Sequence, residues 1–295
     1  MKVLVLGSTG LLGQSLIKSL KSKKDGKKDV IVVGVARKNA EVNLDITNSE
    51  HLISALDQIK PNIIINSTAL VDHNLCEEKP DFAYLINARP IDVLSAWSDK
   101  NSAYFIQIST DHYYVGDKNK KHNEEDKINI VNEYARTKYL GEKLALINQN
   151  SLVIRTNIVG FRNQPQPTFL EWALQSLKTG SKMNLFNDYF TSSIHVKQLA
   201  EIIFDIIKLK PAGTLNVSSS EVSSKETFII ALAKKFNLNL NNYNSIKVAD
   251  SGLIKRAESL GLDTRKVESI LGYKMPDLKE VIQSIYEEYL LNNKI

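Results

Sequence analysis

The sequence has a single cysteine, few tryptophans and no long apolar run. That cysteine, Cys76, excludes an internal disulfide and is typical of a protein from a reducing compartment. No apolar stretch approaches the roughly 20 residues that a membrane-spanning helix needs. The first residues read as a strand ending at Gly7, and they do not resemble a signal peptide. We therefore expect a cytoplasmic protein that does not associate with membranes.

The sequence also lacks the spacing of a metal site and the pattern of a nucleic-acid-binding surface. The segment 72–77 contains aspartate, histidine, cysteine and glutamate, but it matches no standard zinc spacing, and the other histidines are scattered. The formal net charge is +5, and much of it comes from the lysine-rich segment 21–28, which has no interleaved aromatic residues. We predict no bound metal, no nucleic-acid partner and a solvated loop over 21–28.

Three glycines stand where a strand is expected to turn into a helix. Gly7, Gly10 and Gly13 follow the apolar run 2–6, and from Leu11 onward apolar residues recur at helical spacing. Glycines at such a turn let the backbone approach a pyrophosphate and let the helix pack on the strand. The N–H groups at the start of the helix then bind the phosphates. The pattern predicts a dinucleotide-binding site, because it has the strand and the helix that this motif requires.

The end of the second predicted strand, 30–36, indicates which dinucleotide binds. NAD-binding proteins of this type often have an acidic residue there, which binds the ribose hydroxyls. Here Ala36 stands in that region, and Arg37 and Lys38 follow it. A guanidinium can bind a 2′-phosphate with paired hydrogen bonds, whereas a carboxylate would repel it. We predict NADPH in preference to NADH, with a plain solvated Arg-Lys pair as the alternative.

Strands and helices alternate over residues 1 to about 160. Further strands are expected at 63–65, 103–108 and 152–155, and helices at about 48–59, at about 81–99 and from Tyr134 to near Asn148. This alternation predicts an α/β fold with a Rossmann-type doubly wound parallel sheet. Later helices are expected at about 168–178, 196–209, 225–236 and 278–291, with a strand at 214–217. We predict a dinucleotide-binding domain over 1–160 and a smaller, mostly helical substrate-binding lobe over 161–295, which could interleave with the first.

Polar or small residues follow the predicted strands at the edge where open parallel sheets bind ligands. The third strand ends at 66–69, where small residues leave room for a cofactor, and the fourth delivers Ser109, Thr110 and Asp111. Asp45 and Ile46 could flank an adenine, the first through a hydrogen bond and the second through apolar contact. Alternatively, Asp45 only opens a turn.

Tyr134 and Lys138 are four residues apart, so they share one face of a helix. An ammonium beside a phenol stabilises the phenolate and lowers the pKa of the tyrosine, which suits proton transfer, and the lysine can also hold the nicotinamide ribose. Three other pairs have this spacing. Tyr114/Lys118 falls in a predicted loop, and Tyr139/Lys143 points to another side of the helix that carries Tyr134. Tyr243/Lys247 lies far from the dinucleotide-binding half. We predict that Tyr134 protonates a carbonyl oxygen to which Thr110 or Ser109 donates a hydrogen bond.

Together these motifs resemble the extended short-chain dehydrogenase/reductases, and within them the dTDP-4-dehydrorhamnose reductase-like, sugar-nucleotide-binding branch. The resemblance covers nearly the whole chain. The matching residues are Gly7-x-x-Gly10-x-x-Gly13, Asn66-Ser67-Thr68-Ala69, Cys76-Glu77-Glu78-x-Pro80, Ser109-Thr110-Asp111, Tyr134-Ala135-Arg136-Thr137-Lys138-x-x-Gly141-Glu142, Arg155-Thr156 and Arg256-x-x-Ser259-x-x-Leu262-Asp263.

The resemblance implies roles for the matching residues. Together with the residue patterns above, it gives predicted sets of catalytic, cofactor-binding and substrate-binding residues. The catalytic set is Thr110, Tyr134 and Lys138. The cofactor set is Gly7, Thr9, Gly10, Leu11, Leu12, Gly13, Arg37, Lys38, Asp45, Ile46, Ala69, Leu70, Val71, Tyr134 and Lys138. The substrate set is Ser109, Thr110, Asp111, Tyr134 and Arg256. From its position, the segment 186–193 is expected to form part of the substrate rim.

Three departures from the family pattern fall on the predicted substrate side. The segment 112–116 replaces the usual Tyr-Val-Phe and is one residue longer. Ile158 stands where the rhamnose enzymes have a tryptophan, so an aromatic plate over a sugar ring is lost. Ala257 follows Arg256 where proline is usual. The reaction is therefore better predicted than the sugar.

The resemblance implies an NAD(P)H-dependent reductase of the 4-keto group of a nucleotide-linked deoxysugar, in dTDP-rhamnose and polysaccharide biosynthesis. Its partner would be a nucleotide-sugar substrate, and a homodimer is left open. The same branch includes non-catalytic subunits, such as the regulatory β subunit of methionine adenosyltransferase, which bind a dinucleotide but modulate a partner enzyme. A further alternative is a nucleotide-sugar epimerase or dehydratase with tightly held NAD, against which Arg37 argues.

Overall fold

The computed structural model describes residues 1–162, 164, 166–252 and 255–292, and the chain forms two compact units. The first unit comprises Met1–Thr110, Ile130–Arg155 and Ala200–Leu215, and the second comprises Asp111–Asn129, Thr156–Leu199 and Asn216–Ile295. The units interleave along the chain, an arrangement that the sequence left open beside its main boundary near residue 160. Ala200–Leu215 joins the first unit because Glu201 accepts a hydrogen bond from Ser19 Oγ (2.7 Å) and because residues 213–215 extend the central sheet.

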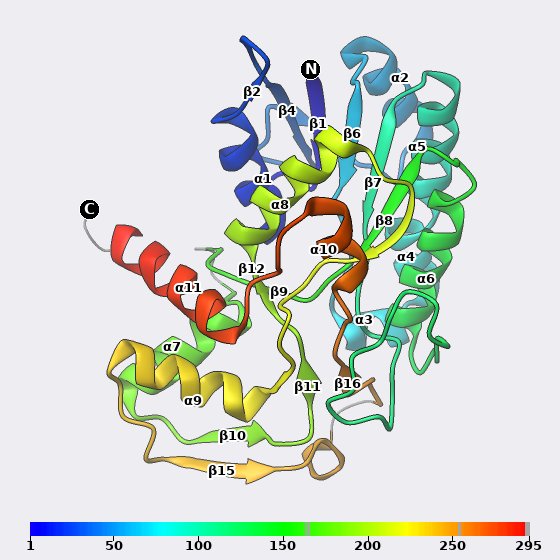
Figure 1. Cartoon of the computed structure of the whole chain (residues 1–295). Coiled ribbons are helices and arrows are strands. Elements are labelled where there is room, and N and C mark those ends of the chain that lie inside the picture. Colours follow the sequence, from blue (N-terminus) through cyan, green and yellow to red (C-terminus); the bar gives the residue numbers. More distant parts are fainter. Residues whose placement is uncertain (163, 165, 253–254, 293–295) are drawn as a thin grey trace. The chain divides into compact units, whose positions relative to one another are not determined.

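A seven-stranded sheet forms the core of the first unit (Figure 1). In spatial order its strands are β13 (Gly213–Asn216), β8 (Ser151–Arg155), β7 (Tyr104–Ile108), β6 (Ile63–Asn66), β1 (Lys2–Leu6), β4 (Ile31–Ala36) and β5 (Val42–Asn43). The pairs β1–β4, β1–β6, β4–β5, β6–β7 and β7–β8 are all parallel. Strands β6, β7 and β8 are buried along their whole length, as expected where helices cover both faces. The predicted doubly wound sheet is confirmed.

The order of the strands reverses at β1. Leu6 pairs with Val35 of β4 on one side and with Asn66 of β6 on the other. Chain connections therefore leave β1 in both directions, and open α/β sheets bind ligands beyond the carboxyl ends of the strands at such a point. The glycine turn follows β1 directly, so the fold places it at this position.

Helices cover both faces of the sheet in the first unit. They are α1 (Leu11–Lys21), α2 (Ser49–Ile59), α3 (His73–Glu78), α4 (Pro80–Asn87), α5 (Arg89–Lys100), α6 (Glu133–Ala145) and the later part of α8 (Val196–Leu209). Apolar residues of α2, α5 and α6 pack with β1, β6, β7 and β8 in one buried cluster. Figure 1 shows α1 and α8 on the opposite face of the sheet.

The structure corrects two local predictions in this unit. The helix expected over about 81–99 is broken into α4 and α5 at Ala88, because Pro90 has no N–H to donate to the carbonyl of Ile86. The lysine-rich segment, expected to be a loop, contains a small antiparallel hairpin of β2 (Lys24–Asp25) and β3 (Lys28–Asp29), which turns at Gly26 with φ of +63°.

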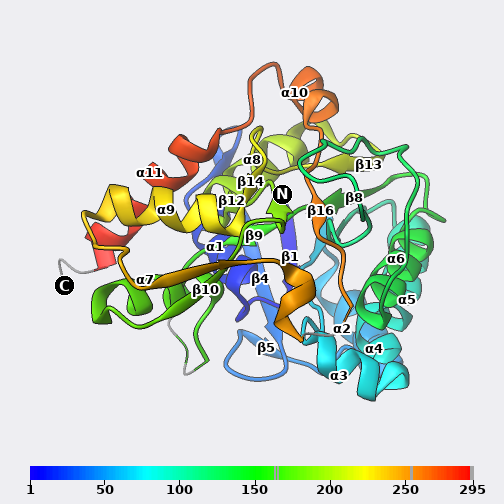
Figure 2. The ribbon, with the colours of Figure 1, turned by 90° about the horizontal axis from the view of Figure 1, so that it is seen from below.

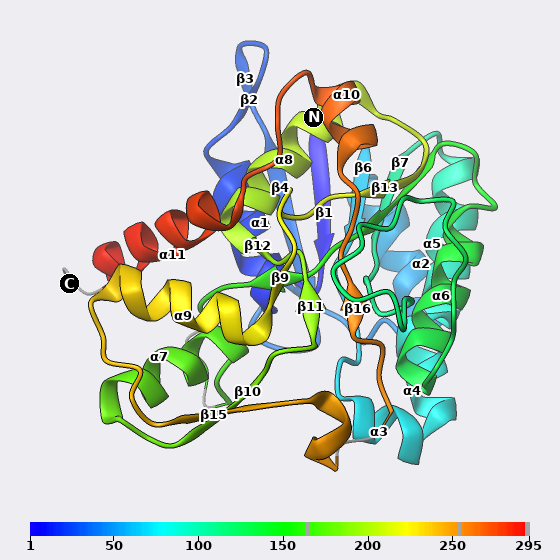
Figure 3. The same cartoon turned by 60° about the horizontal axis from the view of Figure 1, so that its bottom comes forward.

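Over its described residues, the second unit combines helices with short strands. The helices are α7 (Phe169–Thr179), α9 (Lys225–Phe236), α10 (Arg265–Leu271) and α11 (Leu278–Asn292), and a short 3₁₀ turn covers Val248–Ser251. The strands are β9 (Ile158–Val159), β10 (Met183–Phe186), β11 (Phe190–Thr191), β12 (Ile194–His195), β14 (Ser223–Ser224), β15 (Tyr243–Ile246) and β16 (Ser259–Leu260). Figure 2 shows β10 and β15 running side by side, and Figure 3 shows β11 beside β16.

Helices α7, α9 and α11 enclose the apolar core of the second unit. A capping box starts α7, because Thr168 Oγ1 accepts the Glu171 N–H while the Glu171 carboxylate accepts the Thr168 N–H. Among the residues that the structure describes, no helix combines the length and the apolar character needed to cross a bilayer.

Candidate active site

The glycine turn packs tightly between the ends of β1 and β6. Gly7 has a φ of +78°, which residues with a Cβ rarely adopt, and a Cβ there would lie 3.0 Å from Ser67 Oγ. A Cβ on Gly13 would lie 2.0 Å from the Gly7 carbonyl oxygen, because α1 begins directly against the turn. Strand, turn and helix can approach this closely only with glycine at both positions.

The first turn of α1 is suited to an anion. Gly10 is its N-cap residue and supplies no side-chain hydrogen bond, and the first turn contains no acidic residue. The N–H groups of an uncapped helix start carry partial positive charge and can bind phosphate oxygens. The turn therefore fits the pyrophosphate of a dinucleotide. Of the other predicted residues, Thr9 lies in the turn, while Leu11 and the buried Leu12 begin the helix.

The residues predicted near the adenosine end of the cofactor differ in exposure. Arg37 and Lys38 follow β4, and both side chains are exposed. Asp45 accepts hydrogen bonds from the N–H and hydroxyl of Thr47 (2.9 and 2.8 Å), which together with the Arg37 charge lower the pKa of its carboxyl. Asp45 thus opens a turn, as the sequence allowed, and its contact with adenine stays a prediction. Ile46 is buried in the core of the first unit, and its role also stays a prediction.

A buried asparagine fixes the loop after β6. The Asn87 carboxamide accepts the Leu70 N–H (2.7 Å) and donates to the Leu70 carbonyl (3.1 Å). The same amide group also donates to Thr137 Oγ1 on α6 (3.1 Å). Ala69 and Val71 flank this clamped residue, and the Val71 side chain is 63% exposed. The predicted cofactor loop is therefore held to the helix that carries Tyr134.

Lys138 joins α6 to the end of β7. Its Nζ donates a hydrogen bond to the Ile108 carbonyl (2.8 Å), two residues before Thr110. Thr110, Tyr134 and Lys138 are all buried, and Tyr134 lies one helical turn before Lys138. Burial lowers the pKa of Lys138 to about 8, while the negative charge of Glu142 acts in the opposite direction. The first unit thus brings a phenol, an ammonium and a hydroxyl to the carboxyl edge of the sheet, where a phenol can protonate a ligand oxygen.

A buried ion pair links α6 to the ends of β7 and β8. The Glu142 carboxylate accepts hydrogen bonds from Arg155 Nε and Nη2, the shorter at 2.8 Å. It also accepts one from Ser109 Oγ (2.6 Å). Glu142 and Arg155 are almost fully buried, so each charge depends on the other. Ser109, predicted as a substrate residue, is thereby tied to α6, and its contact with substrate stays a prediction.

Sequence reasoning gave His73 no role, but its ring packs against Tyr134. The two ring centroids are 4.6 Å apart. Asn132, the N-cap residue of α6, accepts the Ala135 N–H through Oδ1 and places Nδ2 3.4 Å from His73 Nδ1. Glu77 of the same short helix α3 accepts the N–H of Glu133 (2.6 Å). A helix as short as α3 has too few residues for a visible period, so nothing in the sequence signals this support.

The other tyrosine–lysine pairs occupy different surroundings. The Tyr114 ring stacks on the buried His122 ring, with centroids 3.9 Å apart. Lys143 Nζ lies 4.9 Å from the centroid of Tyr139 on the same helix. Tyr243 begins strand β15 of the second unit. None of these pairs has a lysine bonded to the end of a central strand within the described residues.

Two predicted substrate residues belong to the second unit. Asp111 is fully buried, and Asn157 Nδ2 donates to its Oδ2 (2.9 Å). Asn157 Oδ1 in turn accepts a hydrogen bond from Ser193 Oγ (2.6 Å). Arg256 is partly buried, and its Nε makes no hydrogen bond to the residues that the structure describes. Their contact with substrate stays a prediction.

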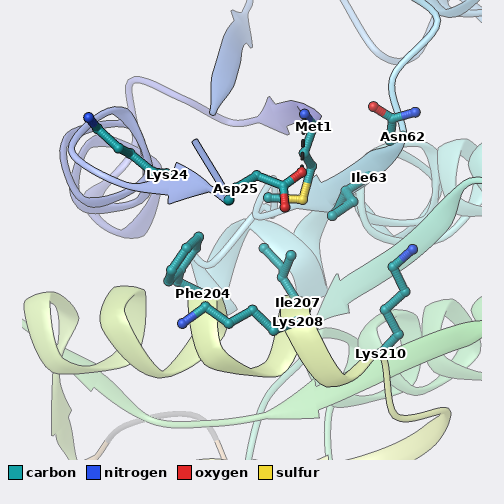
Figure 4. A pocket seen from close by; sticks show the side chains of 10 residues that line it. Met1, Lys24, Asp25, Asn62, Ile63, Phe204, Ile207, Lys208 and Lys210 are labelled. Carbon is teal, nitrogen blue, oxygen red and sulfur yellow. Dashed lines mark ion pairs between the residues drawn. The ribbon is translucent and has the colours of Figure 1, made fainter. Parts of the chain in front are cut away.

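A cavity of about 520 Å³ lies in the first unit at the amino ends of the strands. Figure 4 shows Met1 and Ile63 on one side and Phe204 and Lys208 on the other. This cavity is at the opposite end of the sheet from the glycine turn, so it is not the candidate site. No group of three histidine, cysteine, aspartate or glutamate side chains that could hold a metal occurs in the part of the chain described.

Comparison with known proteins matches residues 1–291 of this chain to the family model "RmlD substrate binding domain". Three relatives are similar over nearly all of this chain. A probable low-salt glycan biosynthesis reductase from Haloferax volcanii is 25% identical over 98% of this chain and 99% of its own length. A dTDP-4-dehydrorhamnose reductase from Aggregatibacter actinomycetemcomitans is 26% identical over 96% of this chain and 98% of its own. The methionine adenosyltransferase 2 subunit beta from Bos taurus is 27% identical over 93% of this chain and 84% of its own.

A solved structure has the same fold. The dTDP-4-dehydrorhamnose reductase from Bacillus anthracis, crystallised in complex with NADP, superposes with a TM-score of 0.84. It is 23% identical, and the match covers 97% of this chain and 98% of that one.

Proposed function

This chain belongs to the RmlD substrate binding domain family, and from that membership and its site we propose that it is an NADPH-dependent reductase. The proposed substrate is a nucleotide-linked deoxysugar whose 4-keto group is reduced, within polysaccharide or other glycan biosynthesis. The reductases from Haloferax volcanii and Aggregatibacter actinomycetemcomitans support this reaction class. We also propose that the protein works in the cytoplasm and that it could form a homodimer.

The observation that carries the proposal is the hydrogen bond from Lys138 Nζ to the Ile108 carbonyl (2.8 Å). It places an ammonium at the carboxyl end of β7, one helical turn after Tyr134 and next to the strand end that delivers Thr110. Many tyrosine–lysine pairs with this spacing occur on helix surfaces, where both side chains are exposed to solvent. Here both side chains are buried at the edge where the glycine turn also lies.

In the proposed reaction, a nicotinamide held at this site would supply hydride to the carbonyl carbon. Thr110 donates a hydrogen bond to the carbonyl oxygen and orients it. Tyr134 transfers its proton to the same oxygen as negative charge develops there. Lys138 stabilises the resulting phenolate and holds the nicotinamide ribose. The uncapped start of α1 binds the pyrophosphate.

We propose NADPH as the preferred cofactor because Arg37 and Lys38 are exposed at the end of β4, where a 2′-phosphate would lie. The NADP complex of the Bacillus anthracis enzyme supports this choice, and NADH remains the alternative. Michaelis constants for NADPH and NADH measure the preference. A lower constant for NADH would refute the proposed role of Arg37.

The substitution Tyr134→Phe tests the proposed chemistry. We expect it to abolish turnover of nucleotide 4-ketosugars, followed by loss of reduced nicotinamide absorbance, while leaving NADPH affinity nearly unchanged. The matched control is Tyr139→Phe, which removes a hydroxyl five residues further along α6, and it should retain turnover. Full activity of Tyr134→Phe would remove the assignment.

A regulatory subunit is the second candidate, and the methionine adenosyltransferase subunit from Bos taurus favours it. Such a protein would bind the dinucleotide without turning over any ketosugar. Purified wild-type protein with a panel of nucleotide 4-ketosugars distinguishes the two functions. Binding of NADPH without turnover, together with co-purification of a partner enzyme, would support the regulatory function.

A further inference from the structure

The second unit holds a lysine ammonium that is not paired with a carboxylate. Lys225 is the first residue of α9, which begins beside β11 (Figure 3), and its N–H donates to the Tyr189 carbonyl (3.0 Å). Its Nζ lies 4.5 Å from the centroid of Phe169 and 5.9 Å from that of Tyr189. Across the described residues, this Nζ makes no hydrogen bond and no ion pair within 4.0 Å.

The position of Lys225 is unfavourable for a cation. Positive charge at the start of a helix opposes the helix dipole, whereas Lys234 and Lys235 lie in the last turn of α9, where the dipole favours them. Burial lowers the pKa of Lys225 to about 8, and the charge of Asp111 offsets only part of this effect. Two aromatic faces compensate weakly for lost hydration. A residue that breaks several local preferences at once commonly serves a ligand.

The surroundings of Lys225 contain groups suited to a sugar. Asp111 is buried and lies close enough to influence the lysine electrostatically. From Asp111, hydrogen bonds continue through Asn157 to Ser193 and then to Thr191 Oγ1, which is 3.0 Å from Ser193 Oγ. A carboxylate, a carboxamide and hydroxyls recognise sugar hydroxyls, while the unpaired ammonium can accept the charge of an anionic group.

We propose that Lys225, whose Nζ lies near the rings of Phe169 and Tyr189, binds an anionic group of the substrate, either a phosphate of the nucleotide or a carboxylate of the sugar. This inference rests on the proposed nucleotide-sugar substrate. The Lys225 ammonium loses hydration on burial against the rings, and binding of the substrate would give it an ion pair. Lys225 thereby contributes to selection of charged ligands.

The test compares Lys225→Met with Lys235→Met in the full-length protein. Lys235 is the matched control, because it lies on the same helix with its Nζ 4.9 Å from the centroid of Tyr286. Titration calorimetry with dTDP and UDP measures the phosphate contribution. Inhibition by UDP-glucuronic acid relative to UDP-glucose measures the carboxylate contribution. Steady-state kinetics with a nucleotide 4-ketosugar give KM and kcat separately.

We expect Lys225→Met to weaken one class of ligand by roughly tenfold to a hundredfold, as loss of a hydrogen bond to a charged group does. Its KM should rise while kcat changes little, and Lys225→Arg should restore most of the affinity. Weaker dTDP and UDP binding assigns the anion as phosphate. A loss confined to UDP-glucuronic acid assigns it as carboxylate.

Unchanged affinities for all four ligands in Lys225→Met would overturn the inference, whether or not the variant melts at a lower temperature. If wild type still reduces the ketosugar in that case, the proposed function stands and only the role of Lys225 fails. If wild type neither binds these nucleotides nor reduces any ketosugar, the proposed function fails together with this inference.

Discussion

The buried ammonium of Lys138 makes the rate of the proposed reduction depend on pH. Burial lowers the pKa of this lysine to about 8 from an ordinary value of 10.5. With that pKa, about nine-tenths of the molecules carry the charge at pH 7 and about one-tenth at pH 9. Because the proposed role of the ammonium is to stabilise the phenolate of Tyr134, kcat/KM for NADPH should fall about tenfold between these pH values.

Stability should change in the opposite direction over part of this range. Since the pKa of Lys138 is lower in the folded chain, the unfolded chain binds more protons between pH 8 and pH 10.5. The contribution of Lys138 to the free energy of unfolding therefore rises by about 3 kcal/mol across that interval. Activity would then fall above pH 8 while Lys138 adds to stability rather than reducing it. Measuring both quantities therefore distinguishes titration of Lys138 from alkaline denaturation.

The assay is the pH profile of kcat/KM for NADPH at a saturating ketosugar concentration, with urea unfolding at the same pH values. The variant Lys138→Arg keeps its charge throughout, because a guanidinium does not lose its proton below pH 12. Whatever its absolute rate, its profile should lack the alkaline decrease near pH 8. A wild-type profile that is flat from pH 7 to 9, or a Lys138→Arg profile with the same decrease, would refute this reasoning.

Three further substitutions probe the support of the site. Arg155→Met leaves the Glu142 carboxylate buried without its cation, so urea unfolding should show a loss of about 3–5 kcal/mol, and a variant that is as stable as wild type would contradict the role of the pair. Gly13→Ala forces a Cβ against the turn and should lower kcat/KM for NADPH by about a hundredfold, whereas an unchanged value would show that the turn can move aside. His73→Ala removes the ring packed on Tyr134 and should lower kcat by up to about tenfold, while His73→Phe should retain most of it; equal rates for the two variants would exclude positioning by the ring.

The sequence predicted the features that depend on local patterns. The apolar runs before the glycine turn and before Ser109 lie in β1 and β7, because buried parallel strands need continuous apolar residues. The Tyr134/Lys138 pair was also recognisable, since a spacing of four residues places both side chains on one helix face. Features that follow from period and spacing were therefore accessible without coordinates.

Other features depend on partners that are distant in the chain. Nothing near Asn87 in the sequence indicates that its carboxamide would bind both the N–H and the carbonyl of Leu70. That contact exists only after β6 and α4 are in place. The loop 112–127 reads as polar, yet Tyr113 and His122 are buried in it. Stacking of His122 on Tyr114 stabilises this burial, and such a ring contact leaves no periodic trace in the sequence.

The one sulfhydryl of the protein sits beside the proposed proton donor. Cys76 is completely covered and packs with Ala83 and Tyr134, and burial raises the pKa of its thiol to about 11. Alkylating reagents attack thiolates, so they react with this sulfur only when α3 separates from its neighbours. The native protein thus carries its own chemical reporter: the modification rate of Cys76 measures how often the wall behind Tyr134 opens, and cofactor that tightens this region should slow it.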